Sequence, residues 1–336
     1  MGRHSLVVVC LLALAAFRAS AAQAPSERPL PLRAWKLAFV RDGDIWIAHG
    51  DGSGQELLLK NAQSPAWSPD RKQIAFAREG NVWVAKADGT EQRQVTKKWK
   101  RGSSGARAPQ RWSVLITWDP RLKRLTFSHD ELFSITRAGE KEGDPVTGYS
   151  IFDIPVHPTE RYGLETRWEF PDHAAEFNFS QSFGPAWAPD GKQLAFVRYG
   201  DIWLATRVDQ GAELPEDMRW GYEVTRLAPL ATYDGATYRA SRENDGVTHL
   251  SWSPDGKVIA YSWQRLGGSG TEEIHLLEVA TGKHWRIAQD AVDPRFSPDG
   301  TWIACTARYG KEGVWAISPD GKRHVLLAED GEQPAW

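Results

Sequence analysis

Cysteine is scarce in this chain, with two cysteines in 336 residues. Cys10 lies in an N-terminal apolar stretch that we expect to be removed, which leaves Cys305 alone. A single thiol can form no intramolecular disulfide, so the fold must be held by strand pairing and packing. Cys305 could be a reactive thiol or a small buried residue. We favour the buried residue, because other copies of a repeat have Phe or Tyr at its position.

Long apolar segments are missing after the N-terminus. The apolar stretch from Ser5 to Phe17 is too short to span a bilayer as a helix. Arg3 precedes it and small residues follow it, which is typical of a secretory signal peptide. We predict a signal peptide over residues 1–22, cleaved after Ala22, and a periplasmic or secreted mature protein without an integral membrane segment. A proline-containing extended leader is predicted over 23–34 and one domain over 35–336.

An excess of basic charge is also missing. The chain has 41 Lys and Arg against 43 Asp and Glu, a formal net charge of −2. This balance argues against a general nucleic-acid-binding protein. The nine histidines are scattered without metal-ligand spacing, and neither a phosphate loop nor a dinucleotide fingerprint is present. Gly267 to Thr271 is not a G-x-S-x-G motif. We predict no cofactor, no metal and no catalytic residue.

What the chain has in abundance is a repeat. Residues 65–76, "PAWSPDRKQIAF", recur as "PAWAPDGKQLAF" at 185–196 and more loosely at 250–261 and 294–305. The last residues, 333–336, open one more copy, and the continuation of that copy lies at 37–48. A repeat unit divided between the two ends of a chain predicts a ring. The sequence therefore predicts an all-β fold, a six-bladed β-propeller closed by pairing of the C-terminal strand with the N-terminal blade.

Each copy has the same registers. An aromatic residue opens the first strand, and an apolar residue follows nine positions later on the second strand. The opening aromatics are Trp67, Trp118, Trp187, Trp252, Phe296 and Trp336. The third strands are predicted around Trp46, Trp83, Phe133, Trp203, His275 and Trp315, with His275 packed in the place of a Trp. A Ser-Pro-Asp-Gly turn joins the first two strands, although the third copy has Arg121 where Asp is usual.

The motif "PAWSPDGK..IAF...G...IW", followed by "ADGT....VT", resembles the repeat of the TolB-type propeller proteins, from about Leu37 to Trp336 apart from three insertions. Membership implies a propeller fold, a periplasmic location and docking of the envelope lipoprotein Pal. TolB also carries an α/β domain before its propeller, which we expect this chain to lack. The same repeat resembles the propellers of prolyl-oligopeptidase-type peptidases, whose serine nucleophile lies in a separate hydrolase domain.

The three insertions lie between the second and fifth copies, and most of their length should project from the face opposite the Ser-Pro-Asp-Gly turns. Function tends to reside on such loops. The first insertion, 97–114, is basic and contains no acidic residue. Its candidate binding residues are Lys97, Lys98, Trp99, Lys100, Arg101, Arg111 and Trp112. They could bind an anionic partner, or they could form a solvated basic loop whose two Trp fold onto the body.

The other two insertions are ambiguous. The second, 138–183, is rich in aromatic residues and should supply a fourth strand at Tyr149 to Ile154. Its remainder could form a ligand platform, but we favour a small satellite core. The third, 207–246, adds to the same rim.

Arginine recurs two residues after the second-strand aromatic, at Arg41, Arg78 and Arg198. These side chains could form a circle near the central channel and bind carboxylates or phosphates. We favour local pairing with neighbouring acidic residues. His129 and His249 could approach the channel only through tertiary structure.

These observations favour a non-catalytic scaffold that binds a protein partner, such as one associated with the cell envelope, through the loop-bearing face. Two alternatives stay open. One is a propeller enzyme, a hydrolase or lyase, with its site at the central channel. The other is a module that binds an acidic glycan or the cell wall.

Overall fold

The fold is almost wholly β. The computed structural model describes residues 31–96, 115–134, 145–155, 166–167, 182–198, 201–209, 220–228, 247–264 and 272–336. Within these ranges the one helical element is η1 (Pro31–Ala34), a single 3-10 turn. The all-β prediction is confirmed.

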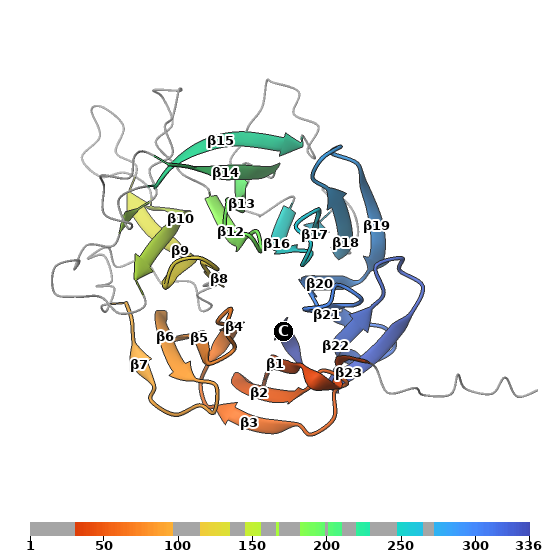
Figure 1. Ribbon diagram of the computed structural model, residues 1–336. Coiled ribbons are helices and arrows are strands. Elements are labelled where there is room, and N and C mark those ends of the chain that lie inside the picture. Colours follow the sequence, from red (N-terminus) through yellow and green to blue (C-terminus); the bar gives the residue numbers. More distant parts are fainter. Residues whose placement is uncertain are drawn as a thin grey trace, which may run out of the picture.

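Strand pairing gives six four-stranded sheets arranged around a central axis (Figure 1). Given from the axis outward, the sheets are β24 (Glu332–Ala335), β1 (Lys36–Arg41), β2 (Asp44–His49), β3 (Glu56–Leu59); β4 (Gln63–Trp67), β5 (Gln73–Arg78), β6 (Asn81–Lys86), β7 (Arg93–Gln94); β8 (Leu115–Trp118), β9 (Arg124–Ser134), β10 (Pro145–Pro155), β11 (Thr166–Arg167); β12 (Ser182–Trp187), β13 (Gln193–Arg198), β14 (Asp201–Asp209), β15 (Trp220–Ala228); β16 (Val247–Trp252), β17 (Val258–Gln264), β18 (Glu272–Glu278), β19 (His284–Gln289); β20 (Ala291–Phe296), β21 (Ile303–Arg308), β22 (Glu312–Ile317), β23 (His324–Glu329).

This arrangement is a β-propeller, as the repeat predicts. The predicted number of six blades is not confirmed. A count of blades gives five, whereas strand pairing gives six sheets. The sheet that departs most from the others is β8–β11, in which β9 and β10, each 11 residues long, are followed by a two-residue β11.

The two ends of the domain meet in one sheet. Strand β24 pairs antiparallel with β1, with Ala335 opposite Ala38 and Glu332 opposite Val40. Trp336 is 7% exposed and packs in one apolar cluster with Leu37 and Phe39. The predicted pairing of the C-terminal strand with the first sheet is confirmed, and no covalent bond contributes to it.

The opening aromatics connect each sheet to the preceding one. The indole Nε1 of Trp118 donates to the carbonyl of Ala66 at 2.8 Å, and that of Trp252 donates to Ala186 at 2.9 Å. Trp336 donates in the same way to the carbonyl of Arg295 at 3.0 Å. These three rings fill the space between two sheets, and their one polar atom is satisfied there. Trp67 differs, because its buried indole nitrogen has no hydrogen-bond partner within the described residues.

The Ser-Pro-Asp-Gly turns form as predicted. In the turn at 253–256, the Ser253 hydroxyl donates to the Asp255 carboxylate at 2.6 Å and accepts the Val258 amide at 2.9 Å. The third copy replaces this arrangement. There Asp119 accepts the amides of Arg121 and Leu122, and its carboxylate also binds the buried guanidinium of Arg207 from the next sheet.

Two strand predictions for the third copy are wrong. Phe133 lies at the end of the second strand, β9, and the predicted fourth strand at Tyr149 to Ile154 is part of the third strand, β10. The fourth strand is β11. The cause is a missing turn signal. Other copies have a glycine soon after the second strand, such as Gly43, whereas residues 129–134 contain none and the strand continues.

Several other expectations can be compared with the structure. Cys305 is fully buried, and burial raises the pKa of its thiol, as expected of a packing residue. His275 lies 5.5 Å from the Tyr261 ring and is packed as predicted. Residues 31–34 of the predicted leader form η1, and Leu32 is buried against the body. Residues 220–228 of the third insertion are strand β15. The predicted signal peptide lies outside the described residues.

None of the described segments forms a helix of the length and apolar character needed to cross a membrane.

Ring closure can be measured with two tryptophans. Trp336→Ala should lower the free energy of unfolding by about 3–5 kcal/mol, because the ring is buried at the closing junction. Trp285→Ala, at a position 37% exposed on the outer strand β19, should change it by about 0.5 kcal/mol or less. Urea unfolding of both variants checks this. Equal losses would contradict a special role for the junction.

The turns predict a dependence on acid. Hydrogen bonds from Ser253 and from the Lys257 amide lower the pKa of Asp255, and Ser68 and Lys72 lower that of Asp70. A carboxyl whose folded pKa is depressed stabilises the fold above its unfolded pKa of about 3.9. That contribution is lost as the pH falls through the lower folded value. Asp255→Asn should therefore flatten the stability profile below about pH 4, as urea unfolding between pH 2 and 6 would show.

Candidate functional site

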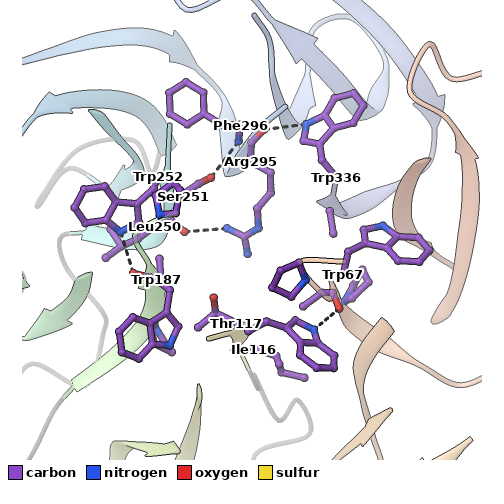
Figure 2. A pocket seen from close by; sticks show the side chains of 18 of the residues that line it. Trp67, Ile116, Thr117, Trp187, Leu250, Ser251, Trp252, Arg295, Phe296 and Trp336 are labelled. Atoms are coloured by element: carbon purple, nitrogen blue, oxygen red, sulfur yellow. Dashed lines mark hydrogen bonds between the residues drawn. The ribbon is translucent and has the colours of Figure 1, made fainter. Parts of the chain in front are cut away.

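The innermost strands of all six sheets surround a central channel. A cavity of 330 Å³ lies at the channel end that carries the Ser-Pro turns, between residues of β4, β8, β12, β16, β20 and the chain end at Trp336 (Figure 2). A second cavity of 390 Å³ adjoins Gly43, which belongs to a turn between second and third strands, and Glu332. The second cavity therefore lies toward the loop-bearing face. His249 and Arg295 line both cavities.

A bulge recurs on the inner strands where they reach this channel. On β4, β12, β16, β20 and β24 the register shifts by one extra residue beside the second strand. The residue three positions before the opening aromatic has a positive φ in each case. These residues are Ser64, Gly184, His249, Asp293 and Gln333, with φ between 48° and 63°.

Four of the five bulge residues are not glycine, and all five line one of the two cavities. The left-handed conformation costs an ordinary residue about 1–2 kcal/mol. Bulges re-aim side chains and occur often beside functional sites. A strained, polar residue repeated around a channel is therefore a candidate binding feature.

Side chains of the preceding sheet hold the bulges. The Asp293 amide donates to the Ser262 hydroxyl at 3.1 Å, and the Gln333 amide donates to the Thr306 hydroxyl at 3.0 Å. The Ser64 amide donates to the side-chain oxygen of Gln333 at 2.8 Å. Ser262 and Thr306 directly follow the second-strand residues Tyr261 and Cys305, a position where several other copies have Val or Ala. The hydroxyl at this position supplies an acceptor that a buried amide needs.

The strongest electrostatic contact at the bulges is between β16 and β20. The imidazole Nε2 of His249 lies 2.8 Å from the Asp293 carboxylate. Burial by itself would raise the pKa of Asp293, but the charge and hydrogen bond of His249, together with the charge of Arg295, hold it below its usual value. Nearby, burial and the charge of Asp293 raise the pKa of Glu272. The channel thus contains both signs of charge.

The predicted arginine circle has a different position. Arg41 donates to the carbonyl of Glu329 at 2.7 Å and to Gln55 at 2.9 Å. Arg78 donates to the carbonyl of Lys60 at 2.9 Å and to Gln92 at 2.8 Å.

Each of these guanidinium groups lies over aromatic rings of its own sheet and bonds to the backbone of the neighbouring sheet. Arg198 is 6% exposed and lies over Trp203. Arg41 and Arg78 donate to backbone carbonyls and to the side-chain amide oxygens of glutamines, in place of the acidic side chains expected from the sequence. Arg41 and Arg78 therefore link neighbouring sheets. None of the three arginines lines either of the two cavities.

The basic segment, Lys97 to Trp112, lies outside the described residues, as does most of the aromatic insertion. Asp293 and Arg295 are channel residues that sequence reasoning did not single out. A signal was present, because Arg295 directly precedes an opening aromatic where other copies have Ala, Thr or Ser. Within the described residues, no group of three or more His, Cys, Asp or Glu side chains is placed to hold a metal ion.

The bulge strain can be measured at His249, whose φ is 48°. His249→Ile and His249→Asn both remove the bond to Asp293, but Asn tolerates the left-handed region and a β-branched residue does not. The Ile variant should be less stable than the Asn variant by about 1–2 kcal/mol in urea unfolding. Equal stability of the two variants would show that the bulge carries no strain.

Comparisons with known proteins agree with this architecture. The family model of the dipeptidyl peptidase IV N-terminal region matches residues 52–106. The Tol-Pal system protein TolB of Francisella tularensis subsp. mediasiatica is 37% identical over 86 residues, which is 24% of this chain and 19% of that protein. Dipeptidyl-peptidase 5 of Porphyromonas gingivalis is 32% identical over 81 residues, 21% of this chain and 12% of that protein.

The fold comparison extends further than the sequence comparison. The crystal structure of TolB from Acinetobacter baumannii matches with a TM-score of 0.59 at 19% identity, over 91% of this chain and 67% of that one. The matched segment of the Francisella protein is less than a quarter of its length, so these likenesses concern the propeller and its repeat. In fold, the chain is therefore similar to the β-propeller of TolB, and its repeat is similar to a segment of TolB.

Proposed function

We propose that this protein is a non-catalytic binding scaffold, periplasmic or secreted after removal of residues 1–22. In this proposal the six sheets are the six blades of one closed ring, and the loop-bearing face engages a protein partner. The observation that carries the proposal is the set of bulge residues at the channel, because strained backbone is retained where a surface has a role beyond stability.

The position of the second cavity favours the loop-bearing face. Gln63, Ser64, His249, Asp293 and Gln333 line it with polar groups on rigid inner strands. Sites built on strands hold their geometry better than sites built on loops alone. The connections β7–β8, β11–β12 and β15–β16, which hold much of the three insertions, join an outermost strand to the next innermost strand and leave the sheets on this same face. A partner could therefore contact the fixed polar mouth and the insertions together.

The similar proteins support the proposal that the partner is a protein. One of them is named as a component of the Tol-Pal system, and its similarity to this chain lies in the propeller repeat. Arg41 and Arg78 would act indirectly in this proposal. By bonding one sheet to the backbone of the next, they would keep the rim of the channel rigid.

The basic segment would attract the partner. In a chain of net charge −2, residues 97–112 carry several Lys and Arg and no acidic residue. Such a cluster steers an acidic protein surface toward the face, and salt weakens this effect.

The test is crosslinking in the native envelope followed by mass spectrometry, and then binding of the identified partner to purified variants. Changing Lys97, Lys98, Lys100 and Arg101 together to Ser should weaken binding and flatten its dependence on salt. The matched control changes the four turn lysines of the opposite face to Ser, which removes the same charge. These lysines are Lys72, Lys192, Lys257 and Lys322.

The control variant should bind as the unchanged protein does. If the two variants lose the same affinity, net charge and not the loop-bearing face governs binding. Sedimentation with peptidoglycan in place of a protein partner would instead support a cell-wall module.

A further inference from the structure

One residue breaks the pattern of the innermost strands. The position directly before the opening aromatic is small in every other sheet, with Ala66, Thr117, Ala186, Ser251 and Ala335. On β20 this position is Arg295. A ring of short side chains leaves the cavity of 330 Å³ open, and the long side chain of Arg295 extends into it (Figure 2), while Arg71 lines it from the turn after β4.

The guanidinium of Arg295 is only partly engaged. Its Nη1 donates to the carbonyls of Leu250 at 3.3 Å and Pro294 at 3.1 Å. These two bonds fix the plane of the guanidinium. Within the described residues the group makes no other hydrogen bond. Its Nε and Nη2 donors therefore have no partner there, and the side chain lines the cavity. A guanidinium has five N–H donors in a fixed fork that matches a carboxylate, so unused donors at a cavity are suited to an anion.

Two hydroxyl groups line the same cavity. Thr117 and Ser251 occupy the equivalent position on β8 and β16 (Figure 2). The Ser251 oxygen accepts the Phe296 amide at 3.1 Å, which leaves its O–H proton available to a ligand. A cation held in place by carbonyls, with hydroxyl donors across the cavity, is a constellation for an oxyanion.

The neighbouring charges select the valence of the anion. Asp293 lies two residues from Arg295 and its carboxylate binds His249 at 2.8 Å. Burial lowers the pKa of the Arg295 guanidinium, and the negative charge of Asp293 opposes this effect. A dianion such as phosphate would meet this carboxylate at short range. A monoanion is neutralised by the arginine with less repulsion.

We propose that Arg295, with Thr117 and Ser251, forms a carboxylate-binding subsite in the central channel. Its ligand is a carboxylate carried by the partner, either an Asp or Glu side chain or a chain terminus. This inference rests on the proposed scaffold function and adds to it the chemical group that the channel recognises. Arg295 and His249 line both cavities, so the subsite adjoins the second cavity, which lies toward the loop-bearing face.

Three short probes distinguish the sources of the carboxylate. Acetyl-Ala-Glu-Ala-amide carries only a side-chain carboxylate, acetyl-Ala-Ala-Ala with a free C-terminus carries only a terminal one, and acetyl-Ala-Gln-Ala-amide carries neither. Titration into the full chain, followed by NMR, should show saturable binding of at least one acidic peptide. That peptide should bind about tenfold or more tightly than the Gln peptide, the value of one charge-assisted contact.

The matched variants are Arg295→Ala and Arg308→Ala. Arg295→Ala introduces the residue that three other sheets have at this position, so the fold should be retained, and a thermal melt checks this. It should lose the tenfold preference. Arg295→Gln, which keeps the length without the charge, should lose it too. Arg308→Ala removes an exposed arginine that pairs with Glu312 and should keep the preference.

Two results would overturn the subsite. One is equal binding of the Glu and Gln peptides, or no saturable binding of either acid. The other is an undiminished preference in both Arg295 variants. The scaffold proposal is judged separately by the crosslinked partner. If the partner binds Arg295→Ala as tightly as the unchanged protein, the subsite is wrong and the scaffold stands. If the unchanged protein captures no partner, the scaffold proposal fails whatever the peptides do.

Discussion

The architecture depends on one noncovalent junction, the antiparallel pairing of β24 with β1. Every other sheet is built from consecutive strands, so each could form from local pairing. The first sheet needs the last residues of the chain. Because the described chain has a single free cysteine, no disulfide reinforces the junction. The junction is instead stabilised by packing of Trp336 against Leu37 and Phe39 and by the hydrogen bond from the Trp336 indole to the carbonyl of Arg295. The channel exists only because the junction brings the sixth inner strand into place.

On each inner strand, residues a few positions apart serve two roles, the stability of the ring and the proposed recognition of a ligand. The opening aromatics fill the spaces between sheets, and the indoles of four of them, Trp118, Trp187, Trp252 and Trp336, bond to the preceding sheet. Three positions earlier the backbone bulges and presents a polar residue to the channel. The bulge is supported from the preceding sheet as well, through hydroxyls such as Ser262 and Thr306. The packing of neighbouring sheets therefore sets the geometry of the channel lining.

The sequence predicts the repeat architecture well, because each copy carries the same aromatics and the same turn. The fully buried second-strand residues Phe39, Phe76, Phe127 and Phe196 were recognisable from spacing alone. Prediction failed where a local signal was missing. The third copy has no glycine after its second strand, and β9 runs on to Ser134. The channel site was harder to foresee, because His249 and Asp293 are distant in sequence and meet only when two sheets are neighbours in the ring. Arg295 could have been found by comparing equivalent positions, since its departure from a small residue is visible in the repeat.

The pairing of β24 with β1 also has a consequence for how the chain folds. The contacts of this sheet join residues from opposite ends of the polypeptide, so they contribute the largest sequence separations in the molecule. The entropic cost of closing a loop grows only slowly with its length. The loop must nevertheless close before the stabilising contacts of this sheet can form, which slows folding. During synthesis, strands β1 to β3 must wait for the last residues before their sheet has its inner strand. Until β24 has been synthesised, the inner edge of β1 is unpaired and could pair with another chain, which makes the nascent protein prone to aggregation at that stage.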